Sequence, residues 1–412
     1  MANELGTFIV RHRFHIDTRT VFFLDKPSDA SYLSPFYINE QMFHLFACEI
    51  SKDRNNMKIG LLGLPNSGKT TIFNALTRSE AEVAAYANNR AEPNIAVVEV
   101  GDERVPRLSE LYKPKKTTYA SIEIVDFAGF SEGSAREEGL SSAQINLIRN
   151  MDAIALVVRN FSDDLMGEPT PLSDIDTVDT EFILSDMIIT EKRLERIEWS
   201  ANRGKKTNVM EMEDKVLKKI LEELNGGGHI RSFPLNHNEE KLINGFQFIT
   251  QKPFFVILNS GEENFGQNDD LMTQIEEKYK VIEFAGNFEM ELAAFSDTEA
   301  ANMFMDDMGI AESALDRITR FAYDILGHIS FITVGTDEVR AWTVRNGDTA
   351  LKAAGTIHSD LSRGFIRAEC ISYDNLMAYG SEKGARDNGC FRLEGKDYKV
   401  KDGDILNIRF SV

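Results

Sequence analysis

Eight consecutive residues have the types and spacing of a phosphate-binding loop. The segment from Gly63 to Thr70 reads Gly-Leu-Pro-Asn-Ser-Gly-Lys-Thr and fits the pattern Gly-x-x-x-x-Gly-Lys-Ser/Thr. The glycines let the backbone curl, so that successive N–H groups point into one concavity and donate to phosphate oxygens. In such a loop Lys69 reaches the β- and γ-phosphates, and the Thr70 hydroxyl binds Mg²⁺.

The residues on either side of the loop have the character that such a site requires. Residues 58–62 are strand-like and residues 71–76 are helix-like, and the start of that helix adds a positive dipole at the loop. A glycine loop that only connects two elements is the alternative, but a connection requires neither Lys69 nor Thr70. The predicted nucleotide-binding residues of this segment are Gly63, Pro65, Asn66, Ser67, Gly68, Lys69, Thr70 and Thr71.

A second motif, Asp-x-x-Gly, runs from Asp126 to Gly129 at the end of the strand-like segment 121–126. In phosphate-loop nucleotidases a carboxylate at this place holds Mg²⁺, directly or through water. The glycine permits close approach of the backbone to a γ-phosphate. Alone the motif is weak evidence, but behind a complete phosphate loop it predicts Thr70 and Asp126 as the metal site and adds Gly129 to the nucleotide site.

The sequence does not identify a catalytic residue. The residue after the second motif is Phe130, where Ras-like proteins have a glutamine that orients the attacking water. A phenylalanine cannot hydrogen-bond a nucleophile, and no histidine occurs between Met57 and His229. Slow basal hydrolysis is therefore expected, and the catalytic group is left unassigned.

Composition limits the classes of protein to which this chain can belong. It has 412 residues, 42% hydrophobic and 27% charged, which is ordinary for a globular protein of roughly two to four domains. A formal net charge of −20 argues against DNA as a partner, although a local basic patch could still bind nucleic acid.

Three widely spaced cysteines favour buried or free thiols in a reducing compartment. With no apolar run of membrane-spanning length and no signal core, we predict a cytoplasmic protein without membrane association.

Alternating strand and helix signals divide the chain into segments. They run through 57–161 and resume at 247–328, which predicts an α/β nucleotide-binding domain with a mostly parallel sheet. Between them, residues 162–246 place apolar side chains at helical spacing on both sides of Gly204, which predicts an inserted, coiled-coil-like antiparallel helical hairpin. Its dense mixed charges fit either a solvated surface or a partner-docking arm. Residues 329–412 predict a small α+β domain.

Residues 1–56 do not follow this organisation. They mix aromatic residues with scattered charges and have no sustained period, and Met57 begins the first strand of the nucleotide domain directly. Our hypothesis is that Met57 is the natural start, and that residues 1–56 are an atypical extension, either upstream sequence that is not native to the protein or a poorly ordered segment. A genuine small strand-rich appendage is the alternative.

The motifs together resemble those of a known family. They are Gly-Leu-Pro-Asn-Ser-Gly-Lys-Thr-Thr, Asp-Phe-Ala-Gly, Asn259-x-x-Glu262, and the C-terminal stretches Thr333–Gly335, Glu338–Trp342, Gly364–Glu369 and Leu393–Tyr398. Over residues 57–412 the chain resembles the YchF/Obg-like ATPases, Obg-related P-loop NTPases with a C-terminal TGS domain. The resemblance implies a TGS-like fold for 329–412, and it accounts for Phe130 and for the inserted hairpin.

The candidate base-recognition motif departs from that of Ras-like proteins. Their Asn-Lys-x-Asp is replaced here by Asn259, Ser260 and Glu262. The carboxylate is longer by one methylene and the bracing lysine is missing, so selectivity for guanine should fall. The family resemblance implies that ATP is bound as well as GTP or better, with Asn259, Ser260 and Glu262 in the nucleotide site. An ordinary strand-to-loop turn is the alternative.

Two further positions concern ions. The family has a threonine three residues before Pro93 and Asn94, where it helps to hold Mg²⁺; this chain has Arg90 there, which would leave water to complete the metal site. Arg90 could instead contact phosphate or remain an exposed arginine. Asn66 resembles the asparagine that binds a monovalent cation in some related proteins, which implies K⁺ as a further ion.

The leading hypothesis is a Mg²⁺-dependent nucleotide hydrolase with a preference for ATP that acts as a switch on the ribosome. A nucleotide-gated binding module with negligible turnover and a conventional GTPase are the alternatives. The C-terminal segment has basic and aromatic residues in an otherwise acidic chain, which suggests contact with a ribosomal protein or RNA; the helical hairpin is the other candidate. These residues are Arg340, Trp342, Arg345, Arg363, Phe365 and Arg367.

Overall fold

The computed structural model describes residues 57–77, 93–127, 142–163, 167–292 and 312–411, with Met303, Met305 and two short strands near the N-terminus. The chain divides into two compact units, Met1–Asn56 and Met57–Val412. In the first unit, β1 (Ile16–Asp17) and β2 (Thr20–Val21) form an antiparallel pair. The rest of that unit lies outside the described residues. The second unit contains the predicted motifs.

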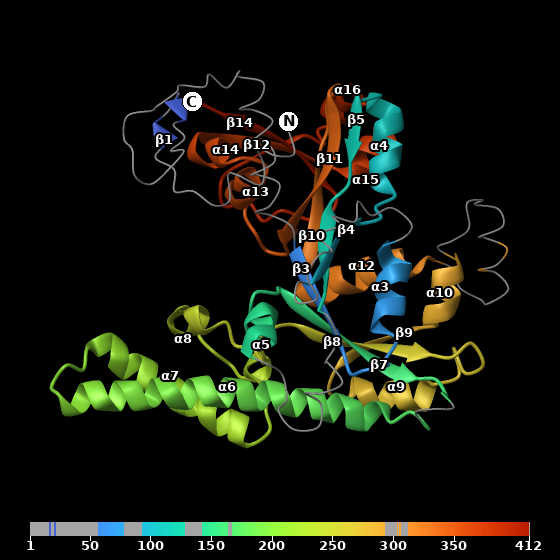
Figure 1. Cartoon of the computed structure of the whole chain (residues 1–412). Helices are drawn as coiled ribbons and strands as arrows, with labels where there is room; N and C mark the ends of the chain where they lie inside the picture. Colours follow the sequence, from blue (N-terminus) through green and yellow to red (C-terminus); the bar gives the residue numbers. More distant parts are fainter. Residues whose placement is uncertain are drawn as a thin grey trace, which may run out of the picture. The chain divides into compact units, whose positions relative to one another are not determined.

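One six-stranded sheet forms the centre of the nucleotide-binding part (Figure 1). Every neighbouring pair of its strands is parallel except the edge pair β4–β6. The predicted α/β architecture with a mostly parallel sheet is confirmed. In spatial order the strands are β4 (Asn94–Glu99), β6 (Ser121–Asp126), β3 (Met57–Gly63), β7 (Ala153–Asn160), β8 (Phe254–Ser260) and β9 (Lys280–Phe284).

Helices cover both faces of this sheet, because its strands are apolar on both sides. In β7, Ala155 and Val157 belong to one buried cluster, and Leu156 and Val158 belong to another, as expected for a strand buried on both faces. The first face packs against α3 (Lys69–Thr77), α4 (Arg104–Tyr112) and α12 (Ala314–Leu326). The second packs against α5 (Ser142–Arg149), the start of α6 (Pro171–Asn202) and α9 (Asp269–Glu276).

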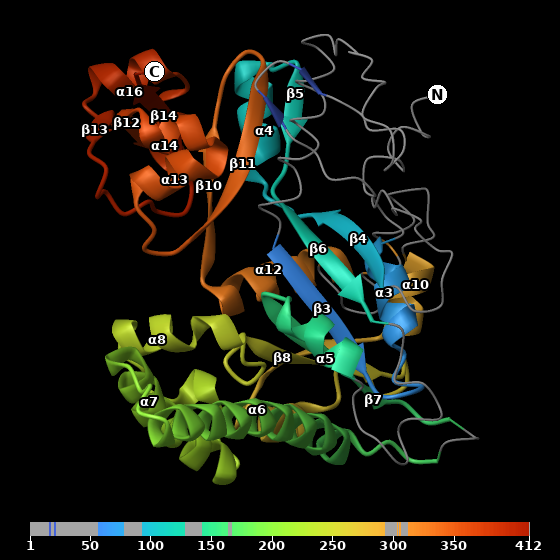
Figure 2. The same ribbon diagram turned by 60° about the vertical axis from the view of Figure 1, so that its left-hand side comes forward.

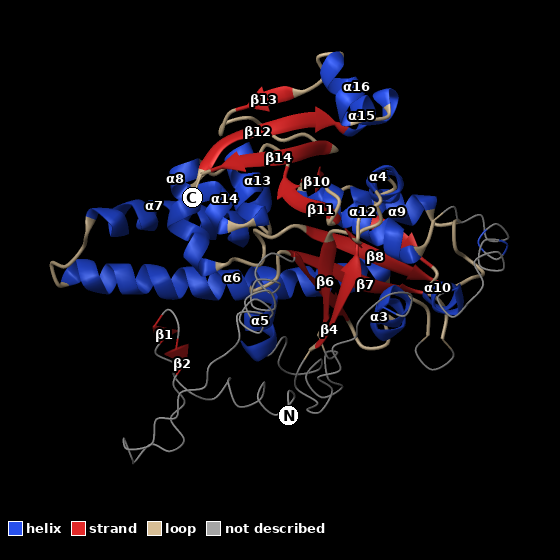
Figure 3. Ribbon diagram, turned by 90° about the horizontal axis from the view of Figure 1, so that it is seen from above, coloured by secondary structure: helices blue, strands red, loops and turns tan. Residues whose placement is uncertain are grey.

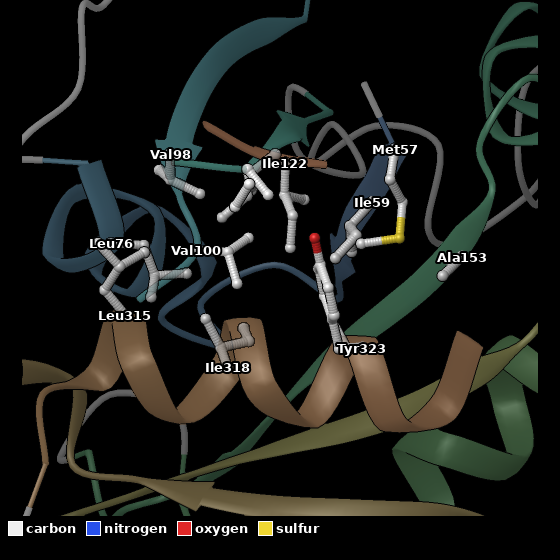
Figure 4. Close-up of a cluster of buried hydrophobic side chains, with 14 of the residues drawn as sticks. Met57, Ile59, Leu76, Val98, Val100, Ile122, Ala153, Leu315, Ile318 and Tyr323 are labelled. Carbon is white, nitrogen blue, oxygen red and sulfur yellow. The ribbon is translucent and has the colours of Figure 1, made fainter. Parts of the chain in front are cut away.

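Helix α12 forms the floor of the first cluster (Figure 4). Its Leu315, Ile318 and Tyr323 face Val98 and Ile122 of the sheet. The Ser313 hydroxyl accepts a hydrogen bond from the Asp316 N–H and caps the helix, which ends at Gly327 in the left-handed region. This helix therefore completes the nucleotide-binding part just before the chain enters the C-terminal sheet.

The predicted antiparallel hairpin is confirmed. It consists of α6 and α7 (Asn208–Asn225), with α8 (His237–Ile243) after it (Figure 3). Gly204, with φ +67°, follows the end of α6, and the Thr207 hydroxyl caps the N-terminus of α7. The Arg193 guanidinium bridges the two helices through two hydrogen bonds of 2.7 Å to Glu213. The helices enclose their own apolar cluster, which contains Ile197, Val216, Leu217, Ile220, Leu224 and Phe248.

A buried ion pair holds the hairpin to the nucleotide-binding part. Arg149, the last residue of α5, lies 2.9 Å from the Asp186 carboxylate in α6, and its guanidinium also donates to the Gln247 carbonyl. Asp186 is fully buried and accepts hydrogen bonds from the Ile249 N–H and from the N–H and hydroxyl of Thr250. The carboxylate thus joins α5, α6 and the segment that leads into β8.

The C-terminal residues form a second six-stranded sheet, in the order β13-β12-β14-β10-β11-β5. One of its edge strands, β5 (Lys116–Thr118), comes from the nucleotide-binding part and runs parallel to β11 (Figure 2). The sequence pattern identified β10 (His328–Thr333), β11 (Glu338–Arg345) and β14 (Asp404–Phe410). It missed β5, β12 (Phe365–Ser372) and β13 (Arg392–Glu394). The helices of this part are α13 (Ala350–Ile357), α14 (Ser359–Arg363), α15 (Tyr373–Tyr379) and α16 (Glu382–Asp387).

The C-terminal sheet is anchored to the nucleotide-binding part by more than β5. The Arg104 guanidinium of α4 lies 2.7 Å from the Asp402 carboxylate, and the Tyr112 hydroxyl donates to Glu382 at 2.7 Å. Val339 of β11 belongs to the same buried cluster as the first face of the nucleotide sheet. Deleting residues 329–412 would therefore expose apolar surface elsewhere in the chain, so point variants are the better probe of this region.

The buried ion pair leads to a stability prediction. We expect Asp186→Ala to lower the free energy of unfolding by about 3–5 kcal/mol, because it leaves the buried Arg149 guanidinium without its counter-charge. Urea unfolding followed by circular dichroism measures this. The matched control is Lys115→Ala in the Lys115–Asp337 pair, whose side chains are 81% and 83% exposed; almost no change is expected there. Equal losses in the two variants would contradict the anchoring role.

Candidate nucleotide-binding site

The predicted phosphate loop connects the end of β3 to the start of α3. Asn66 and Gly68 both have positive φ, +63° and +81°, and the Ser67 N–H donates to the Leu64 carbonyl at 3.2 Å. A Cβ on Gly63 would lie 2.9 Å from the Val157 carbonyl of the neighbouring strand. The loop is therefore a tight turn directly over the carboxyl ends of the central strands, where open α/β sheets bind their ligands.

Asn259, at the end of β8, holds this loop in place. Its side-chain amide donates to the Ser67 carbonyl at 2.9 Å and accepts a hydrogen bond from the Gly286 N–H at 3.0 Å. The residue is buried, and a Cβ on Gly68 would overlap its amide nitrogen. The predicted base-recognition residue is thus also the brace that joins the phosphate loop to the segment after β9.

Gly286 begins α10 (Gly286–Leu292), which a second buried pair ties to α12. The Glu289 carboxylate, on a residue 2% exposed, accepts a hydrogen bond from Arg317 at 3.0 Å. Burial raises the pKa of Glu289, and the nearby guanidinium partly opposes that shift. The Arg317 guanidinium also donates to the Glu283 carbonyl at the end of β9. Arg317 thus holds both sides of the connection between β9 and α10, the connection that Asn259 contacts through the Gly286 N–H.

The two residues expected to handle phosphate and metal are in direct contact. The Lys69 ammonium pairs with the Asp126 carboxylate and donates to the Phe127 carbonyl at 2.6 Å. Both side chains are buried. The other Asp126 oxygen accepts a hydrogen bond of 3.4 Å from the Asn94 amide. The structure thus brings together the two charged groups that the sequence predicted from motifs 57 residues apart.

Asn94 is a site residue that the sequence analysis did not identify. It is the first residue of β4 and pairs in register with Asp126 across the antiparallel strands. From the sequence, Asn94 served only to locate the position of Arg90. Antiparallel pairing at the sheet edge is what places its amide at the carboxylate, and nothing local in the sequence indicates that pairing.

The side chains present suit a magnesium ion bound mainly through its nucleotide. Thr70 is exposed in the first turn of α3, and Asp126 ends β6. Among the residues that the structure describes, no three His, Cys, Asp or Glu side chains converge as a metal cluster. Mg²⁺ is typically held by one or two protein ligands, with phosphate oxygens and water completing its shell. A hydroxyl and a carboxylate fit that requirement.

In the candidate base-recognition segment, Ser260 and Glu262 differ sharply in their surroundings. Ser260 is buried; its hydroxyl donates to Glu283 at 2.5 Å and accepts from the Asn160 amide at 3.0 Å. Asn268 donates to the same Glu283 oxygen at 2.6 Å. Glu262 is exposed. The Ser260 hydroxyl is thus engaged by protein groups, whereas the Glu262 carboxylate faces solvent.

Three predicted positions, Gly129, Phe130 and Arg90, lie outside the described residues. Pro65 and Thr71 are half-buried members of the phosphate-loop segment. The structure therefore assembles the phosphate loop, Asp126 and Asn259 into one site at the carboxyl ends of the central strands.

A parallel sheet that carries such a loop and a strand-end aspartate defines the class of P-loop nucleoside-triphosphate-binding proteins. Two family models match this chain. The model described as "50S ribosome-binding GTPase" matches residues 58–193, and the model YchF-GTPase_C, described as "Protein of unknown function", matches residues 328–411.

Individual relatives extend the match over most of the chain. Proteins named "Ribosome-binding ATPase YchF" cover 86% of this chain and 99% of their own length; those of Bacillus subtilis, Pasteurella multocida and Escherichia coli O157:H7 are 40%, 41% and 38% identical to it. The solved structure of the Schizosaccharomyces pombe YchF GTPase is 31% identical, with a TM-score of 0.76 over 86% of this chain and 98% of that one. The chain belongs to the YchF family, and the resemblance seen in the sequence is confirmed.

The close packing of Asn259 against the loop leads to a prediction about Gly68. We expect Gly68→Ala to weaken ATP binding at least tenfold in calorimetric titration, because the new methyl group displaces the amide that positions the loop. Gly204→Ala is the matched control: Gly204 also has positive φ, but a Cβ there meets nothing within 4 Å. Both variants carry the backbone strain of roughly 1–2 kcal/mol. Unchanged ATP affinity in Gly68→Ala would argue against the bracing role of Asn259.

Proposed function

We propose that this protein is a Mg²⁺-dependent P-loop ATPase that associates with the ribosome. The observation that carries the proposal is the assembled site, in which a phosphate loop braced by Asn259 lies against the Lys69–Asp126 pair. Relatives at about 40% identity are named ribosome-binding ATPases, which supports both the activity and the partner.

The phosphate chemistry follows from the side chains. Loop N–H groups and the start of α3 bind phosphate oxygens, and Lys69 neutralises the β- and γ-phosphates. Bound Mg²⁺, held by Thr70 and Asp126, would supply further charge neutralisation at the phosphates. Because Lys69 and Asp126 now pair with each other, binding of nucleotide with its metal requires both to exchange partners. No described side chain is assigned as the catalytic base. The attacking water then has no group that deprotonates it, which accounts for slow turnover.

Base choice is assigned mainly to Asn259 and Glu262. The engaged hydroxyl of Ser260 leaves its backbone as the group available for a base, while Glu262 is free to reach one. A glutamate in place of the aspartate of Ras-like proteins disfavours the paired contact with guanine, which supports ATP as the substrate. A role for Asn66 in binding K⁺ remains part of the proposal and rests on the likeness of this residue to the cation-binding asparagine of some related proteins.

The ribosome contact was assigned from the sequence to the C-terminal segment or the hairpin. Of the C-terminal cations, Arg340 stacks on the Trp342 ring at 4.0 Å and Arg363 pairs with Asp360. Arg345 and Arg367 are exposed. Arg340 and Trp342 are half-buried, whereas Trp199 of the hairpin is 56% exposed and carries Arg203 on its ring, so we favour the hairpin. In the described residues, no helix combines the length and apolarity that crossing a bilayer requires.

Phosphate release tests the proposed activity. The purified protein with ATP and Mg²⁺ is expected to release phosphate slowly, and ribosomes are expected to change that rate. Lys69→Ala should weaken ATP binding by about 30- to 150-fold, since a charge-assisted contact to phosphate is worth about 2–3 kcal/mol. Lys58→Ala, at the opposite end of β3 and paired with Glu123, is the matched lysine control. Tight ATP binding with no turnover under any condition would instead identify a nucleotide-gated binding module.

Base preference has its own test. We expect Glu262→Asp to shift the ratio of the Kd values for ATP and GTP about tenfold toward GTP, because a shorter carboxylate approaches the geometry of the aspartate–guanine pair. Calorimetric titration with both nucleotides measures the ratio. Glu263→Asp, at the neighbouring exposed position, should leave it unchanged. A ratio that Glu262→Asp does not move would place base selection outside this carboxylate, and a wild-type preference for GTP would identify a conventional GTPase.

A further inference from the structure

The tip of the hairpin has a surface that neither the nucleotide site nor the packing of the two helices explains. Apolar side chains are unusually exposed there: Trp199 is 56% exposed, Val209 55% and Met212 50%. The end of α6, the connection and the start of α7 carry these residues (Figure 1). We define the tip surface as Arg196, Trp199, Arg203, Lys205, Lys206, Val209 and Met212.

The charge of the tip surface is opposite to that of the whole chain. Residues 196–212 contain four cations, Arg196, Arg203, Lys205 and Lys206, and two carboxylates, Glu198 and Glu211, whereas the chain has a formal net charge of −20. All of the four cations are exposed. The segment is therefore a local positive patch on an acidic protein.

The pairing of charges along the hairpin stops at the tip. Elsewhere, Arg193 pairs with Glu213, Lys218 with Asp214, and Lys219 with Glu239, all within 3.1 Å. Within the described part of the chain, the four cations of the tip surface make no such ion pair. Their charge is thus available to a partner, whereas Arg193, Lys218 and Lys219 are already compensated.

A stacked pair completes the surface. The Arg203 guanidinium lies 3.6 Å from the centre of the Trp199 ring, one helical turn away in sequence. Both residues are exposed. A planar guanidinium on an indole offers the two surfaces on which unpaired nucleobases stack, while the adjacent lysines can neutralise the phosphates that follow.

We propose that the tip surface docks a single-stranded segment of RNA, such as an exposed loop. Uncompensated cations beside an exposed aromatic pair favour RNA over a protein partner, because an apolar protein epitope would leave four cations desolvated without counter-charges. The proposal rests on the proposed function, since it names the chemistry through which the protein would contact a ribosome.

Fluorescence anisotropy with a fluorescein-labelled 20-nucleotide oligoadenylate and the full-length protein tests the proposal. Lys205→Ala combined with Lys206→Ala should weaken binding about tenfold and reduce the slope of log K against log salt by about 1.4, for two lost phosphate contacts. Trp199→Ala should weaken binding roughly tenfold without changing that slope, because stacking releases no counterions. Lys241→Ala combined with Lys280→Ala, at exposed lysines outside the two hairpin helices, should behave as wild type.

Separate readouts distinguish this inference from the proposed function. Co-sedimentation of the wild type with 70S ribosomes tests ribosome association, and phosphate release tests the ATPase. A wild-type protein that does not co-sediment, or that releases no phosphate, overturns the proposed function. The tip variants should keep normal basal phosphate release and lose co-sedimentation. If they bind the oligonucleotide as well as the wild type does, RNA docking at the tip is refuted, and lost co-sedimentation alongside intact oligonucleotide binding would indicate a protein partner instead.

Discussion

Two hydrogen bonds made by the buried Asn259 amide hold the nucleotide site together. One goes to the Ser67 carbonyl of the phosphate loop, and the other comes from the Gly286 N–H after β9. Because a buried amide that loses a partner pays the full cost of desolvation, the three segments are fixed relative to one another. The loop can then keep its donors oriented before any phosphate arrives, which is the preorganisation that electrostatic binding and catalysis require. Gly68 is the residue that permits this close approach.

Buried polar contacts and strand pairing also connect the nucleotide-binding part to the hairpin and to the C-terminal sheet. Helix α5 follows the segment after Asp126, and its last residue, Arg149, reaches the buried Asp186 of the hairpin. On the opposite face, β5 adds a strand to the C-terminal sheet. A displacement of α5 would therefore act directly on the middle of α6 through this buried ion pair. This gives the hairpin a physical connection to β6, because α5 shares a buried cluster with Val125 of that strand.

Sequence reasoning succeeded where local pattern determines structure. The phosphate loop, the strand Ser121–Asp126 and the hairpin all have short-range signatures of glycine spacing, apolar runs or helical period. It failed where structure depends on partners far along the chain. The three residues of β5 have no strand pattern and are ordered by β11, more than 200 residues away. Asn94 reaches Asp126 only through antiparallel register, and the Ser260 hydroxyl is engaged by Asn160 and Glu283. Such non-local polar contacts leave no periodic trace in a sequence.

An acidic protein can present a basic surface to RNA only if its own charge does not cancel the attraction. Helix α6 has 32 residues, so it is roughly 48 Å long at 1.5 Å per residue. Physiological salt screens exposed charges beyond about 8 Å. Most of the acidic residues of the nucleotide-binding part therefore contribute little to the potential at the tip, where the local balance of four cations to two carboxylates dominates. Helix length thus separates the acidic body electrostatically from the tip surface, and the buried Arg149–Asp186 pair keeps that extended arm attached to α5.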